Sequence, residues 1–169
     1  MDLDDAYANA PHIPGAEAYP PRWAAEAEAY RKRLGVTGKA RLGLMYGHGT
    51  RQALDLFLPD TPPRGLVVFV HGGYWLRFDR SFWSHLAKGS VDSGFAVAMP
   101  SYTLCPDIRI AGITREIGRA IEHAAGEIDG PMFLTGHSAG GHLVSRMVCA
   151  DTPLSEATRS RLRNVVSIS

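Results

Sequence analysis

The feature that most constrains the fold is an apolar, strand-like run that leads directly into a serine between glycines. Residues 131–136 (PMFLTG) are followed by residues 136–140 (GHSAG), and residues 139–150 then have a helical pattern. Small residues at such a junction let a strand and a helix approach closely, while the serine projects from a tight turn. The pattern therefore predicts a strand–turn–helix unit with Ser138 on the turn.

Other segments carry strand signatures of two kinds. Residues 66–70, 95–99 and 164–169 are continuous β-rich apolar runs, which are typical of strands buried on both faces of a parallel sheet. Residues 40–47 and 52–59 instead alternate apolar and polar side chains, which indicates an antiparallel pair joined through a short turn. The sequence thus predicts two alternating strands followed by a mostly parallel sheet.

Helical periodicity separates the strands. Residues 20–35 begin with prolines and end at a glycine, and residues 82–93 form a shorter, weaker helix. In residues 109–126 one face carries Ile110, Ile113, Ile117, Ile121 and Ala124, and the other carries Arg115, Glu116, Arg119 and Glu122. This alternation predicts an α/β fold with right-handed crossovers and helices on both faces of the sheet.

Length and composition fit one soluble domain. Hydrophobic residues make up 45% of the 169 residues, and the formal net charge is +1 without any basic run, so neither a nucleic-acid nor a membrane partner is expected. The N-terminus lacks the apolar core of a secretory signal, so a cytoplasmic location is expected. We expect residues 1–18 to be a tail and residues 19–169 to be the N-terminal portion of a single domain. Cys105 and Cys149 are expected to be small buried hydrophobic residues, without a metal role.

A second glycine motif follows the buried strand at residues 66–70. Residues 71–75 (HGGYW) should lie at the carboxyl edge of the parallel sheet, where open α/β sheets place their ligands. Ser138 should lie at the same edge, at a helix N-terminus whose free N–H groups favour negative charge. The backbone N–H groups of Gly73, Tyr74 and Ala139 are therefore candidate donors to an oxyanion formed when Ser138 attacks a carbonyl.

The aromatic and histidine residues near these motifs have structural alternatives. His71 is more readily explained as a residue that holds the glycine loop than as a proton carrier. His137 and His142 flank the serine in sequence, but the turn is expected to point them elsewhere, and His142 is expected to be a packing or pocket residue. The rings of Tyr74, Trp75 and Trp83 could equally line a pocket or fill the core.

These motifs together resemble the α/β-hydrolase superfamily, and within it the kynurenine formamidase (arylformamidase) and esterase group. The resemblance covers about residues 20–169 and depends on residues 71–75, 101–110 (SYTLCPDIRI) and 136–142. It implies that Ser138 is the nucleophile of an acyl-enzyme mechanism that cleaves a small acyl group, with no metal or organic cofactor. It also implies the oxyanion-hole donors given above and a small acyl substrate as the partner, and a homodimer is compatible with it. The supporting motif residues are His71, Gly72, Trp75, Gly136 and Gly140.

The sequence departs from that group in one respect. In α/β-hydrolases the triad acid and then the histidine follow the serine along the chain. Asp151 and Glu156 are expected at a helix end and its loop, and no histidine follows His142. The expectation is therefore that the chain is the N-terminal part of a longer hydrolase. A general short-chain carboxylesterase and a non-catalytic hydrolase-like binding domain remain open as alternatives.

Overall fold

A computed structural model describes residues 3–169, and their side chains from residue 5 onward. It contains a six-stranded sheet in the order β1-β2-β4-β3-β5-β6. The strands are β1 (Ala40–Met45), β2 (Ala53–Phe57), β3 (Leu66–Val70), β4 (Ala96–Pro100), β5 (Met132–His137) and β6 (Leu162–Ile168). The α-helices are α1 (Leu3–Ala6), α2 (Tyr19–Val36), α3 (Lys88–Asp92), α4 (Ile110–Glu127), α5 (Ala139–Ser145) and α6 (Glu156–Arg161).

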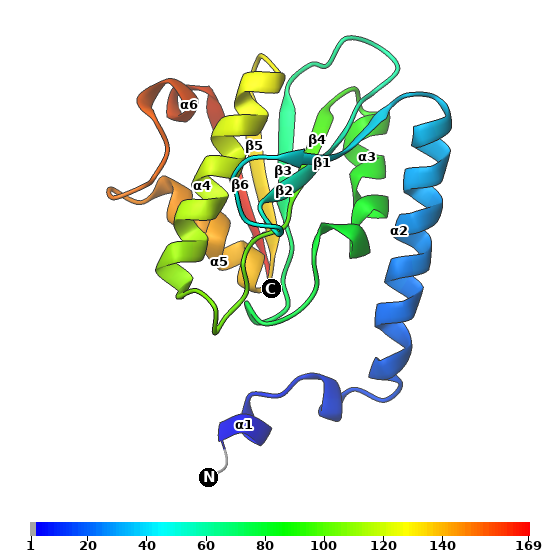
Figure 1. Ribbon diagram of the computed structural model, residues 1–169, viewed down its shortest axis with the longest axis vertical. Coiled ribbons are helices and arrows are strands. Elements are labelled where there is room, and N and C mark those ends of the chain that lie inside the picture. The colour runs from blue at the N-terminus through cyan, green and yellow to red at the C-terminus, as the bar shows by residue number, and fades with distance from the viewer. Residues whose placement is uncertain (1–2) are drawn as a thin grey trace.

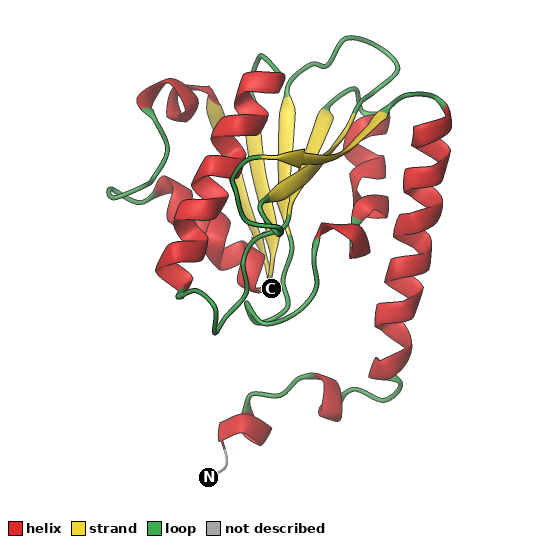
Figure 2. Cartoon of the chain, viewed as in Figure 1, coloured by secondary structure: helices red, strands yellow, loops and turns green. Residues whose placement is uncertain are grey.

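The sheet and its helices form three layers (Figures 1 and 2). Strands β3 to β6 are parallel, whereas β2 pairs antiparallel with both β1 and β4. Helices α4 and α5 pack on one face around a large apolar core, and α2 and α3 cover the other face around a smaller aromatic one. The α/β fold with helices on both faces is therefore confirmed, as is the antiparallel pair at its start.

The register of the central strands brings the two glycine motifs together. Strands β3 and β5 are direct neighbours, and Val70 pairs with Gly136. Because the two strands are parallel and end at the same level, the chain leaves both of them at the same edge of the sheet. Residues 71–75 and Ser138 are therefore neighbours in space although they are far apart in sequence.

Three local predictions need correction. Residues 82–93 are not one helix: 3-10 turns at Arg80–Phe82 and Ser84–Ala87 precede α3, and between them Trp83 leaves helical geometry (φ −123°, ψ 0°) to pack in the aromatic core. Helix α5 ends at Ser145 rather than near residue 150, and a 3-10 turn at Arg146–Val148 follows it. Cys105 and Cys149 are half-buried, not buried.

Glu116 is a fourth correction, because the sequence pattern assigns it to the solvent face of α4. Its side chain is 3% exposed. The carboxylate accepts hydrogen bonds from Gln52 Nε2 (2.7 Å) and from the backbone N–H of Thr103 (2.8 Å). A buried carboxylate is tolerated when donors replace its water. Here the two donors attach the end of the β1–β2 turn and the loop after β4 to α4.

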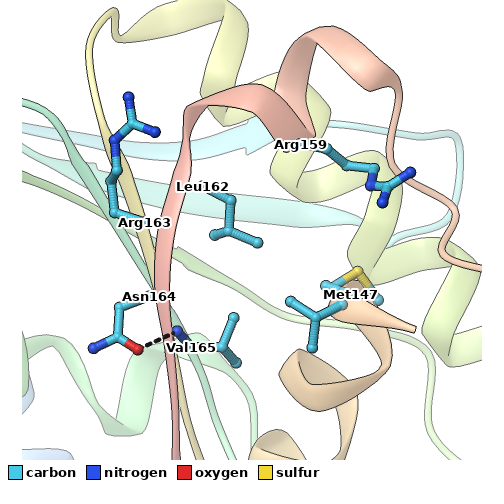
Figure 3. A pocket seen from close by; sticks show the side chains of 7 residues that line it. Met147, Arg159, Leu162, Arg163, Asn164 and Val165 are labelled. Atoms are coloured by element: carbon cyan, nitrogen blue, oxygen red, sulfur yellow. Dashed lines mark hydrogen bonds between the residues drawn. The ribbon is translucent and has the colours of Figure 1, made fainter. Parts of the chain in front are cut away.

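Strand β6 lies at the edge of the sheet. Val166 and Ile168 are 45% and 46% exposed. A hollow of about 380 Å³ lies between β6, α6 and the 3-10 turn Arg146–Val148, with Leu162, Val165 and Met147 turned toward it (Figure 3). This hollow contains neither glycine motif, so it is separate from the site described below.

The N-terminal arm, defined here as residues 5–18, contains short 3-10 turns at Ala10–His12 and Ala16–Ala18. None of its residues is buried. In Figure 1 the arm leads away from the start of α2 and runs beyond the edge of the sheet where the chain end is marked. Within residues 3–169 no helix is both long and apolar enough to cross a membrane.

Candidate active site

Ser138 lies on a sharp turn between β5 and α5. Its backbone has φ 52° and ψ −118°, a conformation that costs a non-glycine residue about 1–3 kcal/mol. The backbone N–H of Ser138 donates to Ile168 O (2.7 Å), so β6 holds the turn. Ser138 itself is exposed, and Ala139, the first residue of α5, is buried.

The two glycines of the motif are required by close packing. A Cβ on Gly140 would overlap the carbonyl oxygen of Val70 and lie 2.7 Å from that of His71. A Cβ on Gly136 would overlap the carbonyl oxygen of Gly140 and lie 2.7 Å from the nitrogen of Gly141. All of these neighbours are backbone atoms, which cannot rotate away. The glycines therefore allow α5 to begin directly against β3 and β5.

The loop after β3 passes directly beside the serine. A Cβ on Gly72 would lie 3.0 Å from Ser138 Cβ and 2.7 Å from His137 O. Gly73, Tyr74 and Trp75 follow with φ values of 116°, 55° and 58°. Consecutive left-handed residues are uncommon outside functional sites, because most side chains disfavour positive φ.

Hydrogen bonds from two segments, the turn between β1 and β2 and the loop after β4, hold this strained loop. Arg51 donates from Nε to Tyr102 O (2.8 Å) and from Nη2 to Phe78 O. The Tyr102 hydroxyl donates to His71 O (3.0 Å), and the N–H of Cys105 donates to Trp75 O (2.8 Å). The loop is therefore fixed at its beginning, its middle and its end.

His71 is a neutral part of this framework. It is 1% exposed and its ring stacks on that of Tyr102 at 4.4 Å. Its Nδ1 lies 2.8 Å from Gly72 O, and because a carbonyl only accepts, Nδ1 carries the proton. Burial lowers the pKa of His71 to about 4. This environment matches the expected role of holding the loop.

A cavity of about 400 Å³ opens at the serine. It brings together Gly72, Gly73, Tyr74 and Ser138, as the sequence predicts, and Trp83 also lines it. His137 lines it too, which corrects the expectation that the turn points this ring elsewhere, because residue 137 ends β5 at the mouth of the cavity.

Trp75 and His142 lie apart from this cavity. Trp75 packs against the large core and meets the exposed ring of His142 edge-on at 5.5 Å. His142 is thus a packing residue of Trp75. The other wall of the cavity comes from the N-terminal arm and α2, with the lining residues Asn9, Ala10, Ile13, Ala16, Tyr19, Pro20 and Trp23.

Within residues 5–169 no histidine or carboxylate forms a hydrogen bond with the Ser138 side chain. Asp151 accepts hydrogen bonds from Arg146 (2.6 and 2.7 Å), and Glu156 pairs with Arg159 on α6. The same described part of the chain contains no group of three or more side chains suited to a metal ion. Among the described residues, Ser138 thus has no hydrogen-bonded side chain that would deprotonate it.

Sequence reasoning missed two contributors to the site. Arg51 lies in the turn between β1 and β2, where nothing in its surroundings marks it as a support for a loop that begins twenty residues later. The wall formed by the arm and by Trp23 was also missed, because this stretch reads as a tail and an ordinary amphipathic helix. Only the density of aromatic residues near Tyr19 and Trp23 hints at it.

Comparisons with known proteins agree with this geometry. The BD-FAE family model matches residues 54–156. Kynurenine formamidase of Salmo salar is 30% identical over 116 residues, which are 65% of this chain and 39% of that protein. The Drosophila melanogaster enzyme of the same name is 31% identical over 125 residues, covering 70% and 41%. The chain thus spans about two fifths of the length of these relatives.

A solved structure is similar over nearly the whole chain. A protein of Silicibacter sp. TM1040, named as a candidate thioesterase, is 59% identical and superimposes with a TM-score of 0.93. The match covers 98% of this chain and 62% of that one. Fold, strand–turn–helix geometry and family match agree: the chain has the α/β-hydrolase fold and belongs to the BD-FAE family.

Proposed function

We propose that the protein is a serine hydrolase that transfers a small acyl group to Ser138 and then to water. The observation that carries this proposal is the position of Ser138 at φ 52° on the turn into α5, with Gly72 packed against it. A serine held in a strained conformation beside a glycine-rich loop has no evident packing function. Strain of this kind is typical of functional sites, which retain it because the surrounding structure fixes it.

In the proposed reaction, Ser138 Oγ attacks a substrate carbonyl carbon and the carbonyl π electrons move onto oxygen. The backbone N–H groups of Gly73, Tyr74 and Ala139 would stabilise that oxyanion, and such donors are each worth about 10²–10³-fold in kcat. The bond between the carbonyl carbon and the leaving group then breaks, and the proton lost by the Ser138 hydroxyl passes to the leaving group. Water attacks the acyl-enzyme, which releases the acyl group as a carboxylic acid and restores the Ser138 hydroxyl. The acid and base of a complete triad have no candidate among residues 5–169, so every activity test uses the full-length protein.

We propose further that the preferred substrate is an aryl formamide such as N-formylkynurenine. The kynurenine formamidase relatives support this substrate, and so does the bulk of Tyr74, which lines the cavity beside the proposed oxyanion donors. Each extra methylene that a pocket must accommodate changes selectivity by about 1–3 kcal/mol. The preference should therefore fall steadily from formyl to acetyl, butyryl and octanoyl.

A second candidate is hydrolysis of a thioester or a short-chain ester at the same serine. The candidate thioesterase, at 59% identity, favours the thioester, and both reactions use the same serine and oxyanion donors. The substrates differ only in the leaving atom, which is sulfur or oxygen instead of nitrogen. The two proposals therefore share one active site and are separated by substrate preference alone.

The test has two stages on the full-length protein. Labelling by a fluorophosphonate, located by peptide mass spectrometry, should fall on Ser138 and disappear in Ser138→Ala. kcat/KM is then compared for N-formylkynurenine, phenyl acetate, p-nitrophenyl octanoate and acetyl-CoA. N-formylkynurenine is expected to have the highest value. If acetyl-CoA or the octanoate ester were preferred, the formamidase assignment would be dropped and the serine hydrolase retained.

A further inference from the structure

The cavity beside Ser138 is much larger than a small acyl group requires. Its volume is about 400 Å³, whereas one water molecule takes up about 30 Å³ of liquid and a formyl group adds only two heavy atoms. Most of the cavity must therefore receive another part of the substrate. Since the acyl carbon has to lie at Ser138 and the backbone donors, that other part is the leaving group.

The rings along one side of this cavity form a continuous series, called here the aromatic wall, made of Tyr19, Trp23, Phe78 and Trp83. Tyr19 stacks on Trp23 at 5.7 Å, and Trp23 lies 4.9 Å from Trp83. Trp83 in turn lies 6.4 Å from the ring of His137, which neighbours Ser138 in the chain. The wall therefore runs from the outer end of the cavity to the serine.

The charge of the lining fits an aromatic group better than a cationic one. The lining contains no carboxylate, and its one residue that is always charged is Arg77. Aromatic faces and edges bind a flat ring through offset or edge-to-face contacts, beyond the burial of area. A flexible alkyl chain would gain no such geometry and would lose conformational entropy on binding.

The N-terminal arm closes the outer side of the same space. Ala10, Ile13 and Ala16 face the cavity, and the Tyr74 hydroxyl donates to Tyr7 O at 2.7 Å across its mouth. Two of these three residues are alanines, whose small side chains leave room for a ligand beside the aromatic wall. The cavity, called here the slot, is thus lined by the rings of the aromatic wall and by a narrow, weakly packed strap that continues into Tyr19.

We propose that this slot binds a flat aromatic leaving group, with Trp23 and Tyr19 as specificity-determining residues. The inference rests on the proposed hydrolysis at Ser138, and it adds which residues select the leaving group. It assigns a binding role to the start of α2, which contributes nothing to the serine turn or to the oxyanion donors. Substitutions at Trp23 and Tyr19 should therefore change the preference between aryl and alkyl leaving groups without changing the attack of Ser138 on the acyl carbon.

The experiment measures the ratio of kcat/KM for phenyl acetate to that for 2,2,2-trifluoroethyl acetate, which share an acyl group. In the full-length protein Trp23→Ala should lower this ratio about fivefold to tenfold, mainly through KM, and Tyr19→Ala should lower it about twofold to threefold. Trp23→Phe should restore most of the ratio. Phe82→Ala is the matched control: Phe82 packs on Phe78 at 5.1 Å but does not line the cavity, so the ratio should not change.

The outcomes separate this inference from the proposed function. If the wild-type protein neither labels at Ser138 nor turns over any ester or amide, the hydrolase proposal fails. If it labels and turns over, but Trp23→Ala and Tyr19→Ala leave the ratio within twofold of wild type, the aromatic slot is wrong and the hydrolase remains. Tyr19 is 44% exposed, so its variant should fold even where Trp23→Ala does not. A selective loss of octanoyl-ester turnover in Trp23→Ala would show that the slot holds an alkyl chain, and would also overturn the inference.

Discussion

The turn at Ser138 and the N-terminal arm face the same cavity but are held in opposite ways. The turn is fixed by backbone contacts of Gly136 and Gly140 that leave no space for a Cβ, and by a hydrogen bond from Ser138 to β6. The arm has no buried residue, and its one described side-chain link to the turn side of the cavity is the Tyr74–Tyr7 bond. In the proposed hydrolase the reacting serine is therefore held in a rigid frame, whereas the wall proposed to select the substrate is attached loosely.

The largest effect should come from removing the Ser138 hydroxyl, the proposed nucleophile on the rigid side of the cavity. Ser138→Ala in the full-length protein should lower kcat by about 10⁴-fold or more, because the acyl-enzyme cannot form. The same change should barely alter the melting temperature, and Ser138→Gly should raise it, because glycine adopts φ 52° without strain. Steady-state kinetics and thermal melts check both statements. Activity that survives in Ser138→Ala would assign the nucleophile elsewhere.

The frame itself should be intolerant of a single methyl group. Gly140→Ala places a Cβ against the carbonyl oxygens of Val70 and His71, so the free energy of unfolding should fall by about 3 kcal/mol or more. Gly126→Ala is the matched control, since Gly126 lies in α4 with nothing within 4 Å of its Cβ position. That variant should gain about 0.5–1 kcal/mol from helix propensity. Urea denaturation measures both, and equal effects would contradict the packing argument.

Acid should destabilise the frame through His71. Its pKa is about 4 in the folded protein and about 6.5 in the unfolded chain, so between these values the unfolded state binds more protons. The stability contributed by neutral His71 is therefore complete above about pH 6.5 and is lost as the pH falls toward 4, by roughly 3 kcal/mol in total.

Urea midpoints between pH 7 and pH 4 test this linkage. His71→Asn, which keeps a donor near Gly72 O, should flatten the profile. His12→Gln, on the arm, where the side chain is 57% exposed, is the matched control. An unaltered slope in His71→Asn would mean that other groups cause the acid sensitivity.

Arg51 should affect catalysis more than stability. Arg51→Met removes the donors to Tyr102 O and Phe78 O, so the loop carrying Gly73 and Tyr74 should relax from its left-handed conformation. A misplaced oxyanion donor lowers kcat, and we expect about a tenfold loss with little change in KM. Arg22→Met, which removes only an exposed pair with Glu26, is the control and should have no effect. A change in KM alone would instead indicate a binding role.

The contrast between the turn and the arm also shows which features could be predicted from the sequence. Strand runs at 66–70 and 131–136 and the glycines around Ser138 are local signals, because a buried parallel strand and a tight turn each demand particular residue types in sequence. They predicted the sheet, the turn and the meeting of both loops at one edge. The assignment of catalytic and oxyanion roles to Ser138, Gly73, Tyr74 and Ala139 stays a prediction.

What the sequence could not reveal depends on contacts across the chain. Glu116 reads as a solvent-face residue of α4, and only its spatial neighbours Gln52 and Thr103 explain its burial. Arg51 and the cavity side of the N-terminal arm are similar cases: their partners lie more than twenty residues away. Periodicity describes which face of an element is apolar, but it carries no information about which polar group on another element will meet it.

The smallest effect should come from the single described hydrogen bond that links Tyr74 to the arm. Tyr74→Phe removes the donor to Tyr7 O but keeps the ring at the mouth of the cavity. An exposed hydrogen bond of this kind contributes about 0.5–1.5 kcal/mol at most, and the loss should be local, because no arm residue is buried. We therefore expect an unchanged melting temperature, a kcat within twofold of wild type, and faster amide exchange in residues 5–18 alone. Hydrogen-exchange mass spectrometry distinguishes faster exchange confined to the arm from faster exchange throughout the protein. If Tyr74→Phe instead lowered the melting temperature as much as Arg51→Met, the arm would be as integral as the serine turn, and the contrast between a rigid frame and a loosely attached wall would not hold.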